Sequence, residues 1–197
     1  MRRSLAAVML AAAGLLSACG GGAATRFYTL EAAPPGPVQP YAGDPFRIDA
    51  VHIPASLDRP ELVRDAGGGR FTVSDNDHWA APVGELLRRV LTQDLAAVLP
   101  AGKVVYPDAP KPPGAGGLVV DILSLSSAKG QMTMEASWTL IPAQGAAGRT
   151  PAGIEQHTVR LTTPATGEGV GGNAIELSAL ARQMTSAIAA DLSRSER

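Results

Sequence analysis

The chain has 197 residues, of which 17 are basic and 18 are acidic, and its formal net charge is −1. Charges spread this thinly give no basic surface for DNA or RNA, so we expect no nucleic-acid partner. The length suits one domain with a sizeable core, and the single cysteine rules out a disulfide within one chain.

The first residues have the layout of an export signal. Two arginines precede an uncharged, apolar run from Leu5 to Leu16, which is shorter than the roughly 20 residues that a membrane-spanning helix needs. The run ends in LSAC at 16–19, which resembles the lipobox of bacterial lipoproteins. The resemblance implies that residues 1–18 are a signal peptide and that Cys19, acylated on its thiol, begins the mature chain. We expect no cofactor other than this covalent lipid.

Behind the anchor, the sequence predicts a tether and then the first well-formed strand. RFYTL (26–30) has the aromatic and β-branched content of a short strand. EAAPPGPVQP (31–40) is interpreted as an extended spacer, because proline lacks a backbone donor. FRIDAVHI (46–53) is a strand with apolar residues on one side. We therefore predict a lipidated segment and proline-rich tether over 19–45, and a single globular domain over 46–197.

A helical period marks the segment from Trp79 to Leu99. Apolar residues recur there at three- and four-residue steps: Val83, Leu86, Leu87, Val90, Leu91, Leu95 and Val98. Pro82 is tolerated in the first turn, and Pro100 stops the helix. We expect Trp79 to open this amphipathic helix and to lie in the core.

The C-terminal half contains three predicted strands and a second helix, after a short strand at 103–106. The strands cover 118–126, 131–141 and 154–163, and their short glycine-bearing links favour antiparallel neighbours. The helix runs over 174–192, with Asn173 as its N-cap and Glu176 completing a capping box. The order β-β-α-β-β-β-β-α predicts an α/β fold of the α+β type. It is one domain with a mixed, largely antiparallel sheet and two main amphipathic helices packed on it.

Motifs that resemble catalytic or cofactor sites lack the context that such sites need. The glycine spacing at 167–172 matches a dinucleotide-binding turn, but only about one helix follows it, without a second parallel strand. The loop from Asp75 to His78 is interpreted as a solvated turn rather than a cation site. The three histidines lie on separate elements without metal-ligand spacing: His52, His78 and His157. We expect neither catalysis nor a bound metal.

Two segments carry a resemblance to a known family. VHIPASLDRPELV (51–63) and WAAPVGELLRRVLTQDLAAVL (79–99), behind FYTL and a lipobox, resemble the ABC-type transport auxiliary lipoproteins. The matching pattern is a strand that ends in Ile53-Pro54, a turn with the sequence LDRP, and a leucine-rich helix opened by Trp79. The resemblance covers nearly all of the mature chain and is strongest over 46–99.

This resemblance implies an accessory subunit of MCE-type lipid transport systems, which move hydrophobic molecules between the two membranes of a Gram-negative envelope. The implied partners are an MCE-domain transport protein or ABC transporter components, and the implied role is docking without catalysis. Gly20 lacks the aspartate that retains enteric lipoproteins at the inner membrane, so we expect the periplasmic face of the outer membrane. The sequence leaves homo-oligomerisation open.

The turn formed by Leu57, Asp58, Arg59 and Pro60 is the candidate partner-binding site. In a structural interpretation, Asp58 pairs with Arg59 and the pair fastens the turn to the body. In a functional interpretation, the exposed turn meets the partner, and Arg59 is suited to a bidentate contact.

Two other functions stay open beside docking. A periplasmic carrier of lipids or other hydrophobic molecules would need a cavity between the sheet and the helices. A body filled by Leu86, Val90 and Trp138 would argue against such a cavity. A structural outer-membrane lipoprotein of another envelope assembly would need no transport partner.

Overall fold

The computed structural model describes residues 23–67, 69–143, 156–166 and 172–194. The predicted signal peptide and Cys19 lie outside the described residues. So does the glycine motif, except for Gly172, which is the first residue of a helix.

A five-stranded sheet forms the centre of the fold, in the order β5-β2-β6-β7-β8. Its strands are β2 (Phe46–His52), β5 (Val104–Val105), β6 (Gly116–Ala128), β7 (Gln131–Ile141) and β8 (Gln156–Pro164). β2 runs parallel to β5 and β6, whereas β6, β7 and β8 are antiparallel. The link between β6 and β7 is Lys129-Gly130, both with positive φ, which suits a tight hairpin. The predicted antiparallel pairing of these strands is confirmed.

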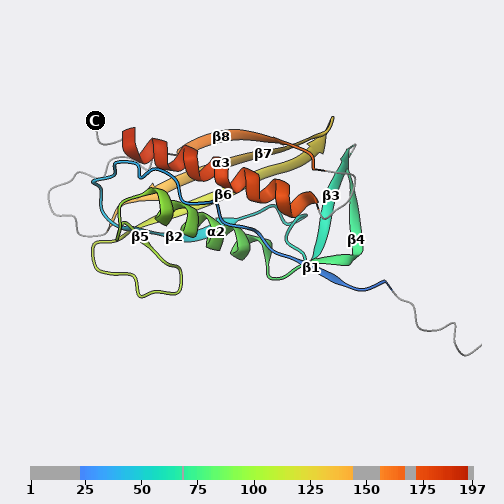
Figure 1. The fold of residues 1–197 in the computed structure, drawn as a ribbon, viewed down its shortest axis with the longest axis horizontal. Coiled ribbons are helices and arrows are strands. Elements are labelled where there is room, and N and C mark those ends of the chain that lie inside the picture. Colours follow the sequence, from blue (N-terminus) through green and yellow to red (C-terminus); the bar gives the residue numbers. More distant parts are fainter. Residues whose placement is uncertain (1–22, 68, 144–155, 167–171, 195–197) are drawn as a thin grey trace, which may run out of the picture.

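Two helices, α2 (Val83–Val98) and α3 (Gly172–Arg194), lie side by side over the larger sheet (Figure 1). Their apolar stripes face inward because residues three and four apart share one side of a helix. Fully buried side chains of this core include Leu87, Val90, Leu95, Leu180, Met184 and Ile188. They meet Phe46, Ile48, Leu118 and Met134 of the sheet in one cluster. The predicted mixed α+β domain is confirmed.

A second, three-stranded sheet stands at one end of the molecule, in the order β1-β4-β3 (Figure 1). It contains β1 (Arg26–Tyr28), β3 (Glu61–Gly67) and β4 (Arg70–Trp79). The sequence predicted one sheet and no strand between 54 and 79. Five of the ten side chains of β4 are exposed, among them Phe71 and Val73, and the next five residues are polar, so no sustained apolar alternation reveals the strand.

This second sheet corrects two expectations. The segment from Asp75 to His78 is part of β4 and not a solvated turn. Trp79 is the last residue of that strand, so α2 begins at Val83 and not at Trp79. The expected packing of Trp79 holds, since it is partly buried against the hydrophobic core.

The proline-rich segment between β1 and β2 lies across both helices and is not a free tether (Figure 1). Ala33 N–H donates to Asp94 Oδ1 of α2 at 2.6 Å, and Glu31 N–H donates to Ser178 Oγ of α3 at 3.1 Å. Leu30 and Tyr41 are buried at its two ends. An extended proline-rich chain keeps its other N–H groups free for lateral bonds, which explains why composition suggested a spacer. The globular body therefore begins at β1 and not at residue 46.

Asp77 holds β1 against β4 through a buried carboxylate. Arg26 Nε donates to Asp77 Oδ1 at 2.6 Å and Arg26 Nη2 to Oδ2 at 2.9 Å. Ser74 Oγ donates to Oδ2 at 2.6 Å. The hydrogen bonds from Arg26 and then Ser74 lower the pKa of Asp77 to about 2, against an ordinary value of 3.8.

Because the folded-state pKa of Asp77 is depressed, its carboxylate stabilises the fold above about pH 4 and loses this effect as the pH falls toward 2. We expect Asp77→Asn to unfold at lower urea concentration than wild type at pH 7. The difference should shrink on acidification. Asp75→Asn, an exposed carboxylate of the same strand, is the matched control and should change little. A deficit of Asp77→Asn that is constant from pH 7 to pH 2.5 would contradict this assignment.

Candidate functional site

The turn between β2 and β3 is fixed by backbone hydrogen bonds at both ends. Pro54 cannot donate to the sheet, so β2 ends, and its carbonyl accepts the N–H of Leu57 at 2.8 Å. The N–H of Arg59 donates to the carbonyl of Leu57 at 3.0 Å. The carbonyl of Pro60 accepts the N–H of Trp79 at 2.7 Å. The turn is therefore fastened to the end of β4 by its main chain.

The side chains of the turn divide into one that faces the body and three that are exposed. Leu57 is half-buried, whereas Asp58, Arg59 and Pro60 are exposed. The predicted Asp58–Arg59 pair is wrong, because Arg59 Nε donates instead to Glu61 Oε2 at 2.9 Å. This bond lowers the pKa of Glu61. Asp58 has no side-chain hydrogen bond or ion pair with any residue that the structure describes.

An apolar hollow of about 30 Å³ opens beside Leu57, where the two sheets and the two helices meet. Its lining comes from Ile53, Leu57, Val63, Trp79, Val83, Leu87, Ile122, Leu125, Asn173 and Leu177. Nine of these ten side chains are apolar, and Asn173 is the polar exception. The sequence indicates several of these residues separately, among them Leu57, Trp79 and Asn173, but does not bring them together, because the walls come from segments far apart in the chain.

The size of the hollow limits what it can hold. About 30 Å³ is close to the space of one water molecule, far below the roughly 300 Å³ or more of a typical ligand pocket. Around it, Leu86, Val90 and Trp138 fill the space between the sheet and the helices. The hollow therefore accommodates the end of one aliphatic side chain.

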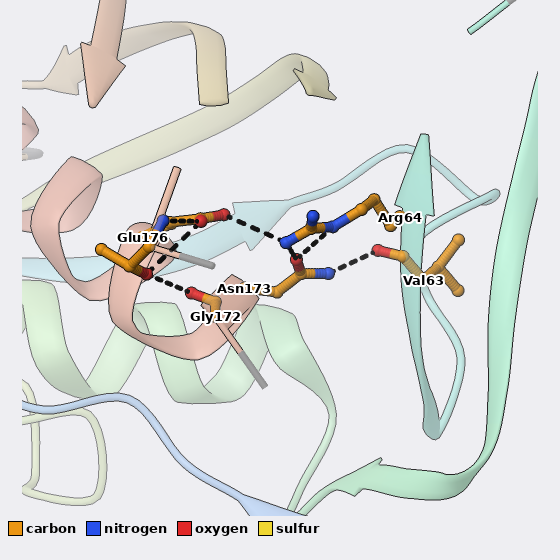
Figure 2. A network of polar contacts seen from close by, with 6 residues as sticks. Val63, Arg64, Gly172, Asn173 and Glu176 are labelled. Atoms are coloured by element: carbon orange, nitrogen blue, oxygen red, sulfur yellow. Dashed lines mark hydrogen bonds and ion pairs between the residues drawn. The ribbon is translucent and has the colours of Figure 1, made fainter. Parts of the chain in front are cut away.

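Asn173, on the first turn of α3, connects that helix to β3 (Figure 2). Its Nδ2 donates to the carbonyl of Val63 at 2.9 Å, and its Oδ1 accepts from Arg64 Nε at 3.2 Å and Nη2 at 3.1 Å. Arg64 Nη2 also lies 3.9 Å from Oε2 of the fully buried Glu176, whose Oε1 accepts the N–H of Thr166 at 2.6 Å. These contacts fix the wall of the hollow that β3 supplies.

The sequence had assigned Asn173 and Glu176 to a capping box, and the structure corrects this assignment. α3 starts at Gly172, so Asn173 lies inside its first turn and not at the N-cap. Instead, Asn173 bonds to β3, and Glu176 bonds to Thr166 in the segment that follows β8. Polar residues at a helix start indicate a cap from local sequence alone, and the long-range partner Arg64 gives no local signal.

The three histidines of the described residues form separate pairs and do not gather into a metal site. His52 Nδ1 lies 2.7 Å from Asp121, His78 Nε2 lies 3.1 Å from the carbonyl of Asp75, and His157 Nε2 lies 3.2 Å from Asp191. These pairs are separate, and no group of three potential metal ligands occurs in the described ranges. No helix in the described part of the chain is long and apolar enough to cross a membrane.

We expect Asn173→Ala to lower the free energy of unfolding by about 2–4 kcal/mol, because the buried carbonyl of Val63 and the Arg64 guanidinium lose partners. Gln183→Ala is the matched control, since it removes an exposed amide of the same helix that donates once, to Thr162. It should cost less than about 1 kcal/mol. Urea unfolding monitored by circular dichroism measures both, and equal losses would remove the special role of Asn173.

Comparisons with known proteins identify the family of this chain. It resembles a solved structure of uncharacterised function, with a TM-score of 0.66 and 17% identity over 86% of this chain and 99% of that chain. It also resembles a DUF330 protein from Xanthomonas campestris, with a TM-score of 0.63 and 15% identity over 84% and 93% of the two chains. These likenesses show a shared fold. No curated protein matches the sequence. The family model for the ABC-type transport auxiliary lipoprotein component matches residues 28–189, and the chain belongs to that family.

Proposed function

We propose that the protein is a lipid-anchored docking subunit of an MCE-type intermembrane lipid transport system. The chain belongs to a family of auxiliary lipoproteins of ABC-type transport, which implies association with a transport system. The observation that carries it is the turn at Leu57, Asp58, Arg59 and Pro60. A rigid frame presents three of these side chains to solvent beside an apolar hollow. A few fixed side chains around a pocket suit recognition of a protein partner.

The alternative of a lipid carrier has less support. A carrier would hold its cargo in a cavity of several hundred Å³, whereas the hollow measures about 30 Å³. Leu86, Val90 and Trp138 are buried in a continuous core where a cargo would lie. A structural lipoprotein of another envelope assembly would share the anchor but would not bind an MCE-domain protein.

The proposed anchor is an acylated Cys19, held at the periplasmic face of the outer membrane. β1 begins at Arg26, seven residues later, so an extended chain places it at most roughly 25 Å from the lipid. One acyl chain holds a protein only marginally, at about 0.8 kcal/mol per buried methylene, so stable attachment needs more than one chain.

We expect Cys19→Ala to remain an unprocessed precursor that carries no lipid. Wild type should appear in the outer-membrane fraction at the smaller, mature size. Metabolic labelling with a palmitate analogue and density-gradient fractionation measure both properties. A Cys19→Ala protein that is processed and localised like wild type would sink the lipoprotein assignment. Wild type found in the inner-membrane fraction would overturn only the sorting.

The docking role predicts that the mature protein captures its MCE-domain partner, or ABC transporter components, from detergent extracts of membranes. Leu57→Asp should weaken capture about tenfold or more, because it puts a charge into the apolar hollow. Arg59→Ala should weaken it less, since its Nε–H already serves Glu61. Ile141→Asp is the matched control, because Ile141 is exposed and lies away from the hollow. It pairs with Gly117 at the start of β6, whereas the hollow is lined by Leu125 near the end of that strand.

Thermal melting must show that each variant is folded before capture is compared. Full capture by folded Leu57→Asp would move the interface to another surface. Failure of wild type to capture any MCE or transporter component would end the docking proposal. Bound phospholipid in that same preparation would favour the carrier.

A further inference from the structure

We infer that the hollow beside Leu57 receives one aliphatic side chain of the partner, while the carboxylate of Asp58 pairs with a lysine or arginine next to it in the same partner segment. The inference deepens the proposed docking function and rests on it. It assigns the recognised element a chemistry: a short segment in which an aliphatic residue adjoins a cation.

The lining of the hollow selects an apolar occupant. Its polar lining residue, Asn173, already uses Nδ2 on Val63 and Oδ1 on Arg64. A water molecule in the hollow would find few of the two to four polar partners that it needs, so an aliphatic group is the better occupant. The volume of about 30 Å³ admits the methyl-sized end of an aliphatic side chain and is too small for a lipid chain.

The hollow is open to solvent at its mouth and closed by buried side chains at its floor. Ile53, Leu57, Trp79 and Leu125 are half-buried and lie toward solvent. The floor consists of side chains that are almost fully buried, among them Leu87 and Leu177 of the two helices. Burying one methyl or methylene group here contributes about 0.8 kcal/mol, which corresponds to a change in affinity of about fourfold.

The walls are held in place before any partner arrives. The bond from Trp79 N–H to the carbonyl of Pro60 joins the turn to β4. The bonds of Asn173 join β3 to α3. A preformed pocket needs little ordering on binding, so more of the burial energy is realised as affinity.

The charge beside the mouth favours a cation. Arg59 is compensated by Glu61, and Arg64 lies against Glu176 and Asn173. Asp58, adjacent to Leu57, is exposed and has no side-chain partner among the described residues, so its carboxylate is the uncompensated charge of the turn. A lysine or arginine beside the inserted side chain would complement it. Such a rim pair orients the segment and speeds association more than it adds affinity.

The test identifies what touches the hollow in native membranes. A photoreactive diazirine side chain replaces that of Leu125 at the mouth, or that of Ile141 as the matched exposed control, in the full-length lipoprotein. After illumination, the adducts are sequenced by mass spectrometry. We expect the Leu125 position, and not the Ile141 position, to yield a partner peptide in which an aliphatic residue lies within two residues of a lysine or arginine.

Capture experiments test the two halves of the inference separately. Leu125→Trp fills the hollow and should weaken capture at least tenfold, whereas Ile141→Trp should not. Asp58→Lys should weaken capture about threefold to tenfold at low salt, and the difference should fade as salt screens the pair. Capture by Asp58→Lys and by Leu125→Trp is compared with wild type only if the thermal melt of each variant matches that of wild type. If Leu125→Trp does not fold, the adduct from the Leu125 position decides.

Several outcomes would overturn the inference. They are an adduct with phospholipid, an adduct with a second copy of this chain, a partner peptide that is acidic or polar, and equal yields from both positions. If wild type captures an MCE-domain protein while any of these occurs, docking stands and this site is wrong. If the cross-linked segment has the expected chemistry but belongs to a protein outside any transport system, the site stands and the proposed function fails.

Discussion

The contact of Asn173 with β3 is the constraint on which the candidate site depends. β3 belongs to the smaller sheet and α3 packs on the larger one, and the amide of Asn173 bonds to the main chain of one from the first turn of the other. No strand of one sheet is hydrogen-bonded to a strand of the other, so side-chain contacts such as this one help to set the relative position of the two sheets. The hollow is the space left where the two sheets and the two helices meet, and the bond from Asn173 to Val63 fixes one of its walls.

The N-terminal segment is joined to the folded body along its length. Residues behind β1 bond to both helices, through Asp94 of α2 and Ser178 of α3. The Arg26–Asp77 pair then fixes β1 to β4, and the carbonyl of Tyr28 accepts the N–H of Ala80. Under the proposed function, a lipid on Cys19 would lie seven residues before β1, which keeps the body within roughly 25 Å of the bilayer. Under the proposed function, the partner then meets the turn at a restricted height and orientation.

The predictable parts of the fold are those that local periodicity encodes. The apolar stripe from Val83 to Val98 predicts a helix, and the alternation of apolar and polar residues along β7 predicts a strand. Each element buries one face, so each leaves a periodic pattern in the sequence. The sequence does not reveal β4, because most of its side chains are polar and half of them are exposed, while backbone bonds pair it with β1 and β3. The composition of the proline-rich segment predicts a tether, because composition cannot show that side chains of the two helices accept its backbone N–H groups. The hollow could not be foreseen, since Ile53 and Leu125 come together through the pairing of β2 with β6, and Asn173 joins them only when α3 packs on that sheet.

The way in which the turn is fastened bears on the choice between its two interpretations. If Asp58 and Arg59 served to hold the turn, their side chains would bond to the body. Instead the main chain does so, because the N–H of Trp79 in β4 donates to the carbonyl of Pro60. The side chain of Arg59 bonds only to nearby Glu61 among the described residues. An exposed pair of this kind contributes about 0–1 kcal/mol to stability. The side chains of Asp58 and Arg59 therefore contribute little to stability. Recognition of a partner, in contrast, explains why an exposed aspartate lies beside an apolar opening.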